Sequence, residues 1–286
     1  MVYFCADDYG ISKASNERIE YCLKNGVLNK VSVLPNGEIE DFRSRLSKDG
    51  AKLSLHINFV EGYPLADAHE LDLIVTESGK FKYSFIGLFF LSLSGKRREL
   101  EKDLYTELQR QIDFWKKECG EGVPMSIDSH QHTHMIPLVF KTLLRVIKDS
   151  GIEVENLRIP AEPLAPYIMT PSLYISYGIK GLIKQWLLGF LGLINRKELK
   201  SSGLNFAYFM GVMFSGRITE NKIRTLLPKY MKLAEKNGKD IEIALHPGCS
   251  QKKETLIDGS RPDFEKFYFS PWRSAEFDTL INFKFE

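Results

Sequence analysis

The sequence predicts a single α/β domain with a mostly parallel sheet of the (β/α)-barrel type. Short apolar runs of strand character alternate with longer helical patterns, which is the order expected of parallel strands joined by crossover helices. The length of 286 residues suits such a barrel, which typically takes about 250 residues. The chain has no internal repeat and no low-complexity segment.

Six strands are predicted from short runs rich in β-branched and other apolar residues, most of them ending at turn residues or at a polar side chain. In chain order they cover residues 2–6, 30–34, 52–59, 125–128, 154–159 and 241–245.

Helices are predicted where apolar residues recur every three or four positions between start and stop signals. Ser12 is a predicted N-cap and Gly26 a predicted stop for the first helix, and Ser270-Pro271 begin the last one. The predicted helices cover residues 13–25, 39–48, 96–117, 138–148, 221–237 and 271–280.

The segment 163–202 breaks this rhythm and is predicted to be an apolar insertion over one rim of the sheet. Its longest uncharged run, residues 163–179, holds three prolines and is shorter than the roughly 20 residues that a spanning helix needs. We therefore expect no membrane span. Because such a surface is hard to leave exposed, we expect it to form a homodimer interface or to cover the ligand cleft.

Charge and cysteine usage exclude several function classes. Thirty-nine basic and 37 acidic residues give a net charge of +2, which gives no reason to expect a nucleic acid partner. The four cysteines are scattered and are expected to be reduced thiols. Asp7-Asp8 leave no room for a secretory signal at the start of this sequence, so we expect a cytoplasmic protein.

Polar clusters follow the carboxyl ends of the predicted strands, where parallel α/β folds place their chemistry. They comprise Asp7-Asp8, His56, Asp128 with His130, and His246, while Arg158 lies within the fifth strand. His69 lies in a polar loop and is given no role. One aspartate and two histidines suit a catalytic divalent ion with open positions for water and substrate. Adjacent carboxylates at a strand end point in different directions, so one can bind the ion while the other accepts a proton.

Simpler explanations exist for each residue alone. Asp7-Asp8 could be a solvated turn, His56 a buried histidine, Arg158 an ion-pair partner and His246 a capping residue. The run from His130 to His134 is harder to explain in this way. If extended, it would put three imidazoles on one face, about 6.6 Å apart, and the spacing would favour His130 and His132 as a ligand pair.

Five motifs in order resemble the YdjC-like carbohydrate deacetylases, which include the chitooligosaccharide deacetylases. The motifs are Ala6-Asp7-Asp8-Tyr9-Gly10, Leu55-His56-Ile57-Asn58, residues 127–135 (IDSHQHTHM), residues 157–162 (LRIPAE) and Leu245-His246-Pro247-Gly248. The resemblance covers nearly the whole chain and is weakest over 163–202. It implies a distorted TIM-like (β/α) barrel and a metal-dependent hydrolase, with Mg²⁺ or Zn²⁺, that removes the acetyl group from N-acetylated sugars.

The resemblance also implies a role for individual residues. Asp8, His56 and His130 match the metal ligands, Asp7 the general base, His246 the general acid and Arg158 an arginine near the base. His132 then becomes a substrate contact instead of a ligand, and Asn58 and Glu162 are further expected substrate contacts. Phe59, Tyr63, Tyr167 and Tyr174 are candidates for stacking on a sugar ring.

Two alternatives stay open at this stage. A metal-dependent amidohydrolase could act on a different N-acyl substrate such as a glycolipid, which the apolar insertion would suit. A non-catalytic sugar-binding protein could retain the same fold, although it would not need Asp7, Asp8 and three histidines together.

Overall fold

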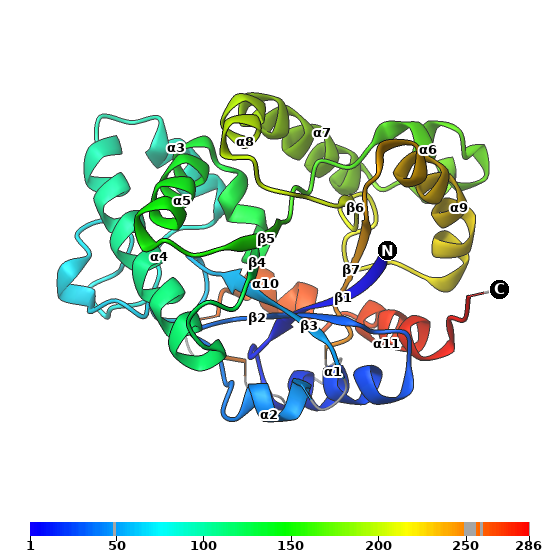
Figure 1. The fold of residues 1–286 in the computed structure, drawn as a ribbon, viewed down its shortest axis with the longest axis horizontal. Coiled ribbons are helices and arrows are strands. Elements are labelled where there is room, and N and C mark those ends of the chain that lie inside the picture. Colours follow the sequence, from blue (N-terminus) through cyan, green and yellow to red (C-terminus); the bar gives the residue numbers. More distant parts are fainter. Residues whose placement is uncertain (48–49, 249–255, 258–259, 286) are drawn as a thin grey trace.

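A computed structural model describes residues 1–47, 50–248, 256–257 and 260–285 of the chain (Figure 1). Lys48, the last residue of one predicted helix, and Cys249 lie outside the described residues. Cys5, Cys22 and Cys119 are free and buried, as expected of reduced thiols.

Seven parallel strands form one sheet in the order β5-β4-β3-β2-β1-β7-β6. They are β1 (Val2–Tyr9), β2 (Lys30–Val33), β3 (Lys52–Ile57), β4 (Met125–Ser129), β5 (Val154–Leu157), β6 (Tyr208–Met210) and β7 (Ile241–Leu245). All six predicted strands are present. The seventh, β6, has three residues and is too short to give a periodic signal.

The sheet curls but does not close into a complete TIM barrel. β5 and β6 are its edges, and no strand ladder joins them in the described part of the chain. The Leu157 N–H donates to the Asn205 carbonyl at 2.9 Å, which is a single bridge between the two edges. The predicted parallel α/β sheet is confirmed, whereas the prediction of a TIM-like barrel is wrong in its closure: the sheet is a half-barrel of seven strands.

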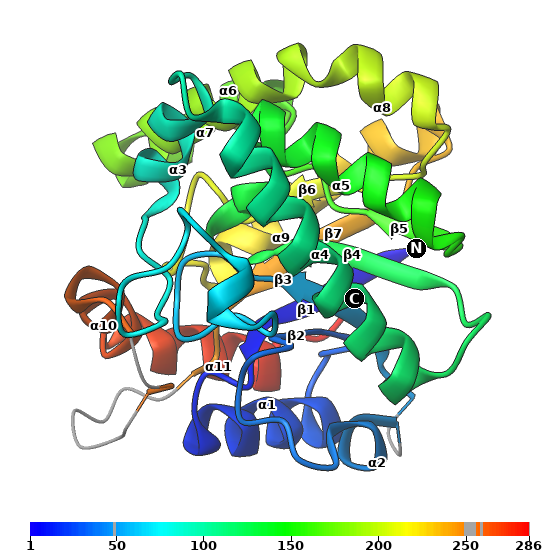
Figure 2. The ribbon, with the colours of Figure 1, turned by 90° about the vertical axis from the view of Figure 1, so that its left-hand side faces the viewer.

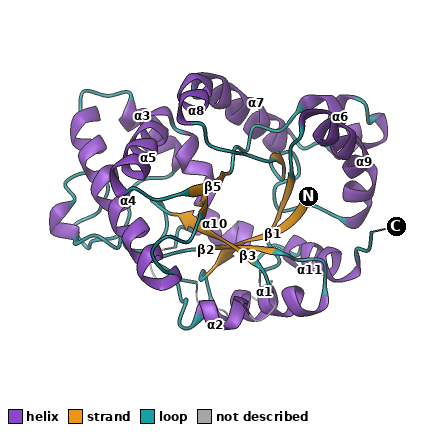
Figure 3. Cartoon of the chain, viewed as in Figure 1, coloured by secondary structure: helices purple, strands orange, loops and turns teal. Residues whose placement is uncertain are grey.

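Helices surround the outer face of this half-barrel (Figure 3). The α-helices are α1 (Lys13–Asn25), α2 (Phe42–Ser47), α3 (Phe85–Ser92), α4 (Arg97–Cys119), α5 (Pro137–Ser150), α6 (Leu164–Ile168), α7 (Ile179–Ile194), α8 (Arg196–Ser202), α9 (Glu220–Asn237), α10 (Pro262–Tyr268) and α11 (Trp272–Asn282). The described residues also form the 3₁₀ helices η1 (Ala68–Glu70), η2 (His130–Met135) and η3 (Pro171–Ser176). Within the described ranges, no helix has both the length and the apolar character needed to cross a bilayer.

The inner face of the half-barrel is polar although its strands are buried. In β2, Lys30 and Ser32 alternate with Val31 and Val33, and all four side chains are buried. Alternate residues of a strand point to opposite faces, so one face packs the apolar core and the other presents charge. The functional site is built on this charged inner face.

Two glycines hold the carboxyl end of β1 against the turn that follows β2. Gly10 has φ of 104°, and a methyl group added to Gly37 would lie 2.4 Å from the Gly10 carbonyl oxygen. Gly37→Ala is therefore expected to destabilise the fold by about 1–3 kcal/mol, because backbone would have to move. Urea denaturation measures the loss. Gly95→Ala is the control, since a methyl group there meets nothing within 4 Å, and equal stability losses for the two variants would contradict the packing argument.

Candidate metal centre

One carboxylate and two imidazoles meet at the carboxyl ends of β1, β3 and β4. Asp8 lies in β1, His56 in β3, and His130 directly follows β4. Asp8 Oδ1 lies 2.7 Å from His130 Nδ1 and 3.3 Å from His56 Nε2, and all three residues are buried. Ligand atoms bound to one ion at about 2.1 Å lie roughly 2.9–3.4 Å apart. The three side chains are therefore close enough to share one divalent cation.

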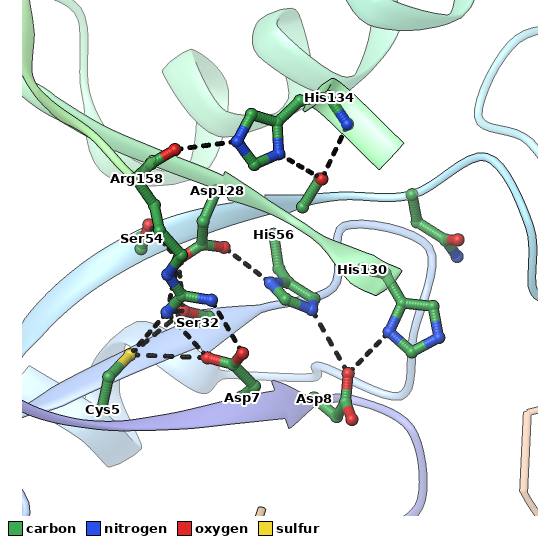
Figure 4. A network of polar contacts seen from close by, with 12 residues as sticks. Cys5, Asp7, Asp8, Ser32, Ser54, His56, Asp128, His130, His134 and Arg158 are labelled. Carbon is green, nitrogen blue, oxygen red and sulfur yellow. Dashed lines mark hydrogen bonds and ion pairs between the residues drawn. The ribbon is translucent and has the colours of Figure 1, made fainter. Parts of the chain in front are cut away.

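The backbone of β1 is irregular where its two carboxylates stand. The β1–β2 register shifts between Ala6 and Tyr9, and Asp8 adopts φ of 67°, a left-handed conformation that Asp tolerates better than most residues. Figure 4 shows the result: Asp8 faces His56 and His130, while Asp7 faces Arg158. A bulge, in addition to strand alternation, thus separates the two neighbouring carboxylates.

Asp128 orients His56 from behind. Its Oδ1 lies 2.6 Å from His56 Nδ1, and its Oδ2 accepts hydrogen bonds from the hydroxyls of Ser32 and Ser54. A proton on Nδ1 directs the Nε2 lone pair toward Asp8, which is the arrangement that carboxylates impose on metal-binding histidines.

The charge around His56 favours a cation. Burial disfavours a charged imidazole, but the carboxylates of Asp128 and Asp8 outweigh it and raise the pKa of His56 to about 10. His130 Nε2 is buried and has no hydrogen-bond partner among the described residues. The atoms that meet at this point are Asp8 Oδ1, His56 Nε2 and His130 Nδ1, and a buried set of one carboxylate and two imidazoles fits a divalent ion such as Zn²⁺.

Arg158 holds Asp7 in a two-pronged ion pair. Its Nη1 donates to Asp7 Oδ2 at 2.7 Å and its Nη2 to Asp7 Oδ1 at 2.8 Å, the planar geometry that arginine offers a carboxylate. Burial raises the pKa of Asp7, yet the guanidinium more than offsets it, and the pKa lies below the ordinary value. Asp7 is thus an ionised carboxylate beside the metal centre.

Further carboxylates and a lysine continue this network into the half-barrel. Arg158 also lies 3.0 Å from Asp128 and donates through Nε to Glu242 at 2.5 Å, and Glu242 pairs with Lys30 at 2.8 Å. Two other groupings, Cys5 with Asp128 and Glu242, and Asp7 with His56 and Asp128, also bring ligand atoms together. Arg158 already forms ion pairs with Asp7, Asp128 and Glu242, so Asp8, His56 and His130 make the better candidate metal site.

Removing Arg158 is expected to destabilise the protein strongly. Arg158→Met would leave three buried carboxylates without their shared cation, and breaking a buried ion pair typically costs about 3–5 kcal/mol. Arg145→Met is the matched control, because Arg145 is 60% exposed and its surface ion pairs are worth at most about 1 kcal/mol. Chemical denaturation measures both, and a loss for Arg158→Met no larger than the control's would contradict this account.

His246 stands at the end of β7 and is tied to the closing helix. Its backbone N–H donates to Glu276 Oε2 at 2.7 Å, and its Nδ1 lies 3.7 Å from the same oxygen. Glu276 also lies 3.5 Å from Arg273. The imidazole is partly exposed and packs edge-on against Phe267. Burial raises the pKa of Asp8, but the imidazoles around it, His130 foremost and then His56 and His246, hold that pKa well below its usual value. His246 is thus a partly exposed imidazole that flanks the candidate metal centre.

The histidine-rich segment is not extended, so the conformation that the spacing argument assumed is wrong. Gln131 and His132 adopt left-handed conformations inside η2, which turns the chain after His130. His132 packs edge-on against Phe209 and is not in the Asp8 group. His134 Nε2 lies 2.8 Å from the Arg158 carbonyl oxygen, and burial lowers the pKa of His134 to about 4, so its ring is neutral. The segment supplies one candidate ligand, His130, and one contact to Arg158, which directly follows β5 instead of lying within it as predicted.

Asn58 and Glu162 are used by the protein itself. Asn58 Oδ1 accepts hydrogen bonds from the N–H groups of Val60 and Glu61, and Glu162 accepts three from residues 211–213. Sugar contact by either stays a prediction, but both side chains shape loops near the site.

The four candidate stacking aromatics differ in exposure. Phe59 and Tyr167 are buried in the core, so their predicted role in stacking on a sugar is wrong. Tyr63 and Tyr174 are exposed, and stacking by these two stays a prediction.

The chain is thus an α/β protein with a curled parallel sheet. The sheet brings Asp8, His56 and His130 together as a candidate metal centre, beside the Asp7 carboxylate that pairs with Arg158. The chain belongs to the YdjC-like family, because the family model described as "YdjC-like protein" matches residues 1–286.

Curated relatives match over part of their length. A carbohydrate deacetylase of Geobacillus stearothermophilus is 32% identical over 161 residues, which are 56% of this chain and 58% of the relative. A chitooligosaccharide deacetylase of Salmonella paratyphi B is 32% identical over 151 residues, which are 51% of this chain and 55% of the relative. The aligned part thus spans somewhat more than half the length of these curated relatives.

A solved structure supports the fold over nearly the whole chain. It is a protein of Enterococcus faecalis V583, provisionally named a cellobiose-phosphate cleavage protein, with a TM-score of 0.62 and 17% identity. The match covers 98% of this chain and 90% of that one. At this identity the likeness concerns the fold alone.

Proposed function

We propose that this protein is a metal-dependent deacetylase that hydrolyses the acetamide of N-acetylated sugars. The observation that carries the proposal is that two adjacent buried carboxylates have different partners. Asp8 contacts the imidazoles of His56 and His130, whereas Asp7 forms an ion pair with Arg158. A hydrolase of this kind can use one carboxylate as a metal ligand and the other as the proton acceptor. The names of the curated relatives, carbohydrate and chitooligosaccharide deacetylase, supply the substrate class.

Asp8, His56 and His130 would hold the ion. A divalent ion held by these residues would supply polarisation of a carbonyl group and a lowered pKa of a bound water. Mg²⁺ prefers oxygen ligands, whereas Zn²⁺ accepts imidazole readily, so the two histidines favour Zn²⁺ over Mg²⁺.

The remaining residues would move protons. Asp7, kept ionised by Arg158, accepts a proton from the attacking water as that water adds to the acetamide carbon. Arg158 fixes the direction of the accepting carboxylate. His246 donates a proton to the sugar nitrogen as the C–N bond breaks, and Glu276 holds the backbone of His246 in place. The products are acetate and a free amino sugar.

An assay of acetate release tests the proposal. The metal-loaded protein is incubated with N-acetylated mono- and oligosaccharides, and acetate and free amine are measured. We expect both in equal amounts, with chelation by EDTA abolishing release and added metal restoring it. Sugar binding without acetate release would instead support a non-catalytic sugar-binding protein.

A further inference from the structure

The outward face of α7 is apolar. Gly181, Gln185, Leu188 and Leu191 point inward at helical spacing. On the opposite side, at the same spacing, stand Ile179, Ile183, Trp186, Phe190 and Leu193, which are between 47% and 77% exposed. A surface helix normally turns polar residues outward, so this stripe calls for a partner outside the single chain.

A second exposed stripe lies on α3, and both helices contact η2, which carries His130. Ile86, Phe90 and Leu93 follow helical spacing and are between 52% and 68% exposed. In Figure 2, α3 and α7 lie on the same side of the sheet, opposite α1. We call these eight exposed residues, namely those of α3 and α7 together with Leu93 directly after α3, the apolar rim.

The charged residues within α7 are all basic, and α3 is followed by a basic run before the first acidic residue, Glu99. α7 carries Lys180 and Lys184 and has no acidic residue, and α3 is uncharged and soon followed by Lys96-Arg97-Arg98. The Trp186 and Phe190 rings stack with an interplanar angle of 4° and are both exposed. Exposed aromatic and aliphatic residues flanked by lysines are typical of helices that lie in the interface of an anionic bilayer.

We infer that the apolar rim docks on an anionic membrane surface, and that the substrate is an N-acetylated sugar carried on a membrane lipid. The second part rests on the proposed function. α7 has 16 residues and is therefore about 24 Å long, too short for a hydrocarbon core of about 30 Å. It would lie in the plane of the interface, with the candidate site beside a lipid-borne sugar.

Charge favours this partner over a second copy of the chain. A two-fold dimer presents the same patch from both subunits, so pairing through the apolar rim would bring the lysines of both α7 helices into one interface, to which α7 contributes no carboxylate. An anionic lipid surface neutralises them instead.

Vesicle binding tests the docking directly. Wild type, Trp186→Glu and Phe190→Glu are sedimented with vesicles of equal parts phosphatidylglycerol and phosphatidylcholine, and with vesicles of phosphatidylcholine alone. Tyr21→Glu is the control, because Tyr21 is an exposed aromatic residue on α1, on the far side of the molecule (Figure 2). We expect wild type to bind the anionic vesicles, the two rim variants to bind about tenfold more weakly or worse, and Tyr21→Glu to bind as wild type does.

The docking proposal would be wrong if the wild-type protein did not bind anionic vesicles. It would also be wrong if Tyr21→Glu weakened vesicle binding as much as the rim variants do. A wild-type dimer in light scattering that the rim variants dissociate, without vesicle binding, would assign the surface to a second copy.

Acetate release separates this inference from the proposed function. Rim variants should match wild type on a soluble N-acetylated oligosaccharide but lose about tenfold or more in rate on an N-acetylglucosaminyl lipid in anionic vesicles. If the rim variants and wild type released acetate from the vesicle-borne lipid at equal rates, the proposal of a lipid-linked substrate would be wrong. Vesicle binding without acetate from either substrate would contradict the deacetylase proposal and leave the docking in place.

Discussion

Asp7→Asn is expected to lower kcat by about 100- to 10,000-fold while the protein stays folded and binds sugar. The asparagine keeps the shape of the carboxylate and can still accept a hydrogen bond from Arg158, but it cannot take a proton from water. Loss of a general base typically costs this much. Steady-state kinetics on an N-acetylated oligosaccharide, together with a thermal melt, measures both effects.

The control for this variant is Asp72→Asn. Asp72 forms an exposed ion pair with Lys102, so its neutralisation should leave kcat unchanged. Near-normal turnover by Asp7→Asn would show that another group accepts the proton, and Asp7 would then be only a structural partner of Arg158.

His56→Ala and His130→Ala are each expected to lose the bound metal and, with it, activity. Each substitution removes one of the three proposed metal ligands. Losing a residue that only hydrogen-bonds to a ligand typically weakens metal binding by roughly 10- to 100-fold, so the loss of metal affinity here should be larger. His132→Ala should keep the metal, because His132 packs on Phe209 and is not one of the three residues, Asp8, His56 and His130, whose ligand atoms lie together. Metal analysis after dialysis against metal-free buffer distinguishes the three variants.

The reverse pattern would contradict the assignment of ligands. If His132→Ala released the ion and His130→Ala retained it, the ligand pair suggested by sequence spacing would be right. The turn at Gln131 would then have to adopt a different conformation when the metal binds.

The strands were predictable because each long one is an apolar run bounded by turns or by a polar residue. The closure of the sheet was not predictable. Whether β5 meets β6 depends on contacts between residues distant in sequence, such as Leu157 with Asn205, and no local pattern encodes that register. The helix α10 was also missed, since the chain before it carries no periodic signal.

The candidate ligands could be predicted because polar residues at the ends of parallel strands converge. The sequence did not reveal the network of buried ion pairs that supports these ligands. Lys30 and Glu242 lie in otherwise apolar strands. A charged residue in a buried strand indicates that it has a buried partner of opposite charge, but the sequence does not show which residue that partner is. The histidine run misled the spacing argument because the left-handed turn at Gln131 and His132 leaves no mark in residue type.

Metal content measured beside kcat for Asp7→Asn and Asp8→Asn tests the central claim most directly. The two residues are adjacent and chemically alike, yet only Asp8 lies among the histidines and only Asp7 is paired with Arg158. The account predicts that Asp8→Asn loses the ion, whereas Asp7→Asn keeps the ion and loses turnover. If Asp7→Asn lost the ion and Asp8→Asn kept it, the two roles would be exchanged, and if both variants kept metal and near-normal turnover, the hydrolase mechanism would be wrong.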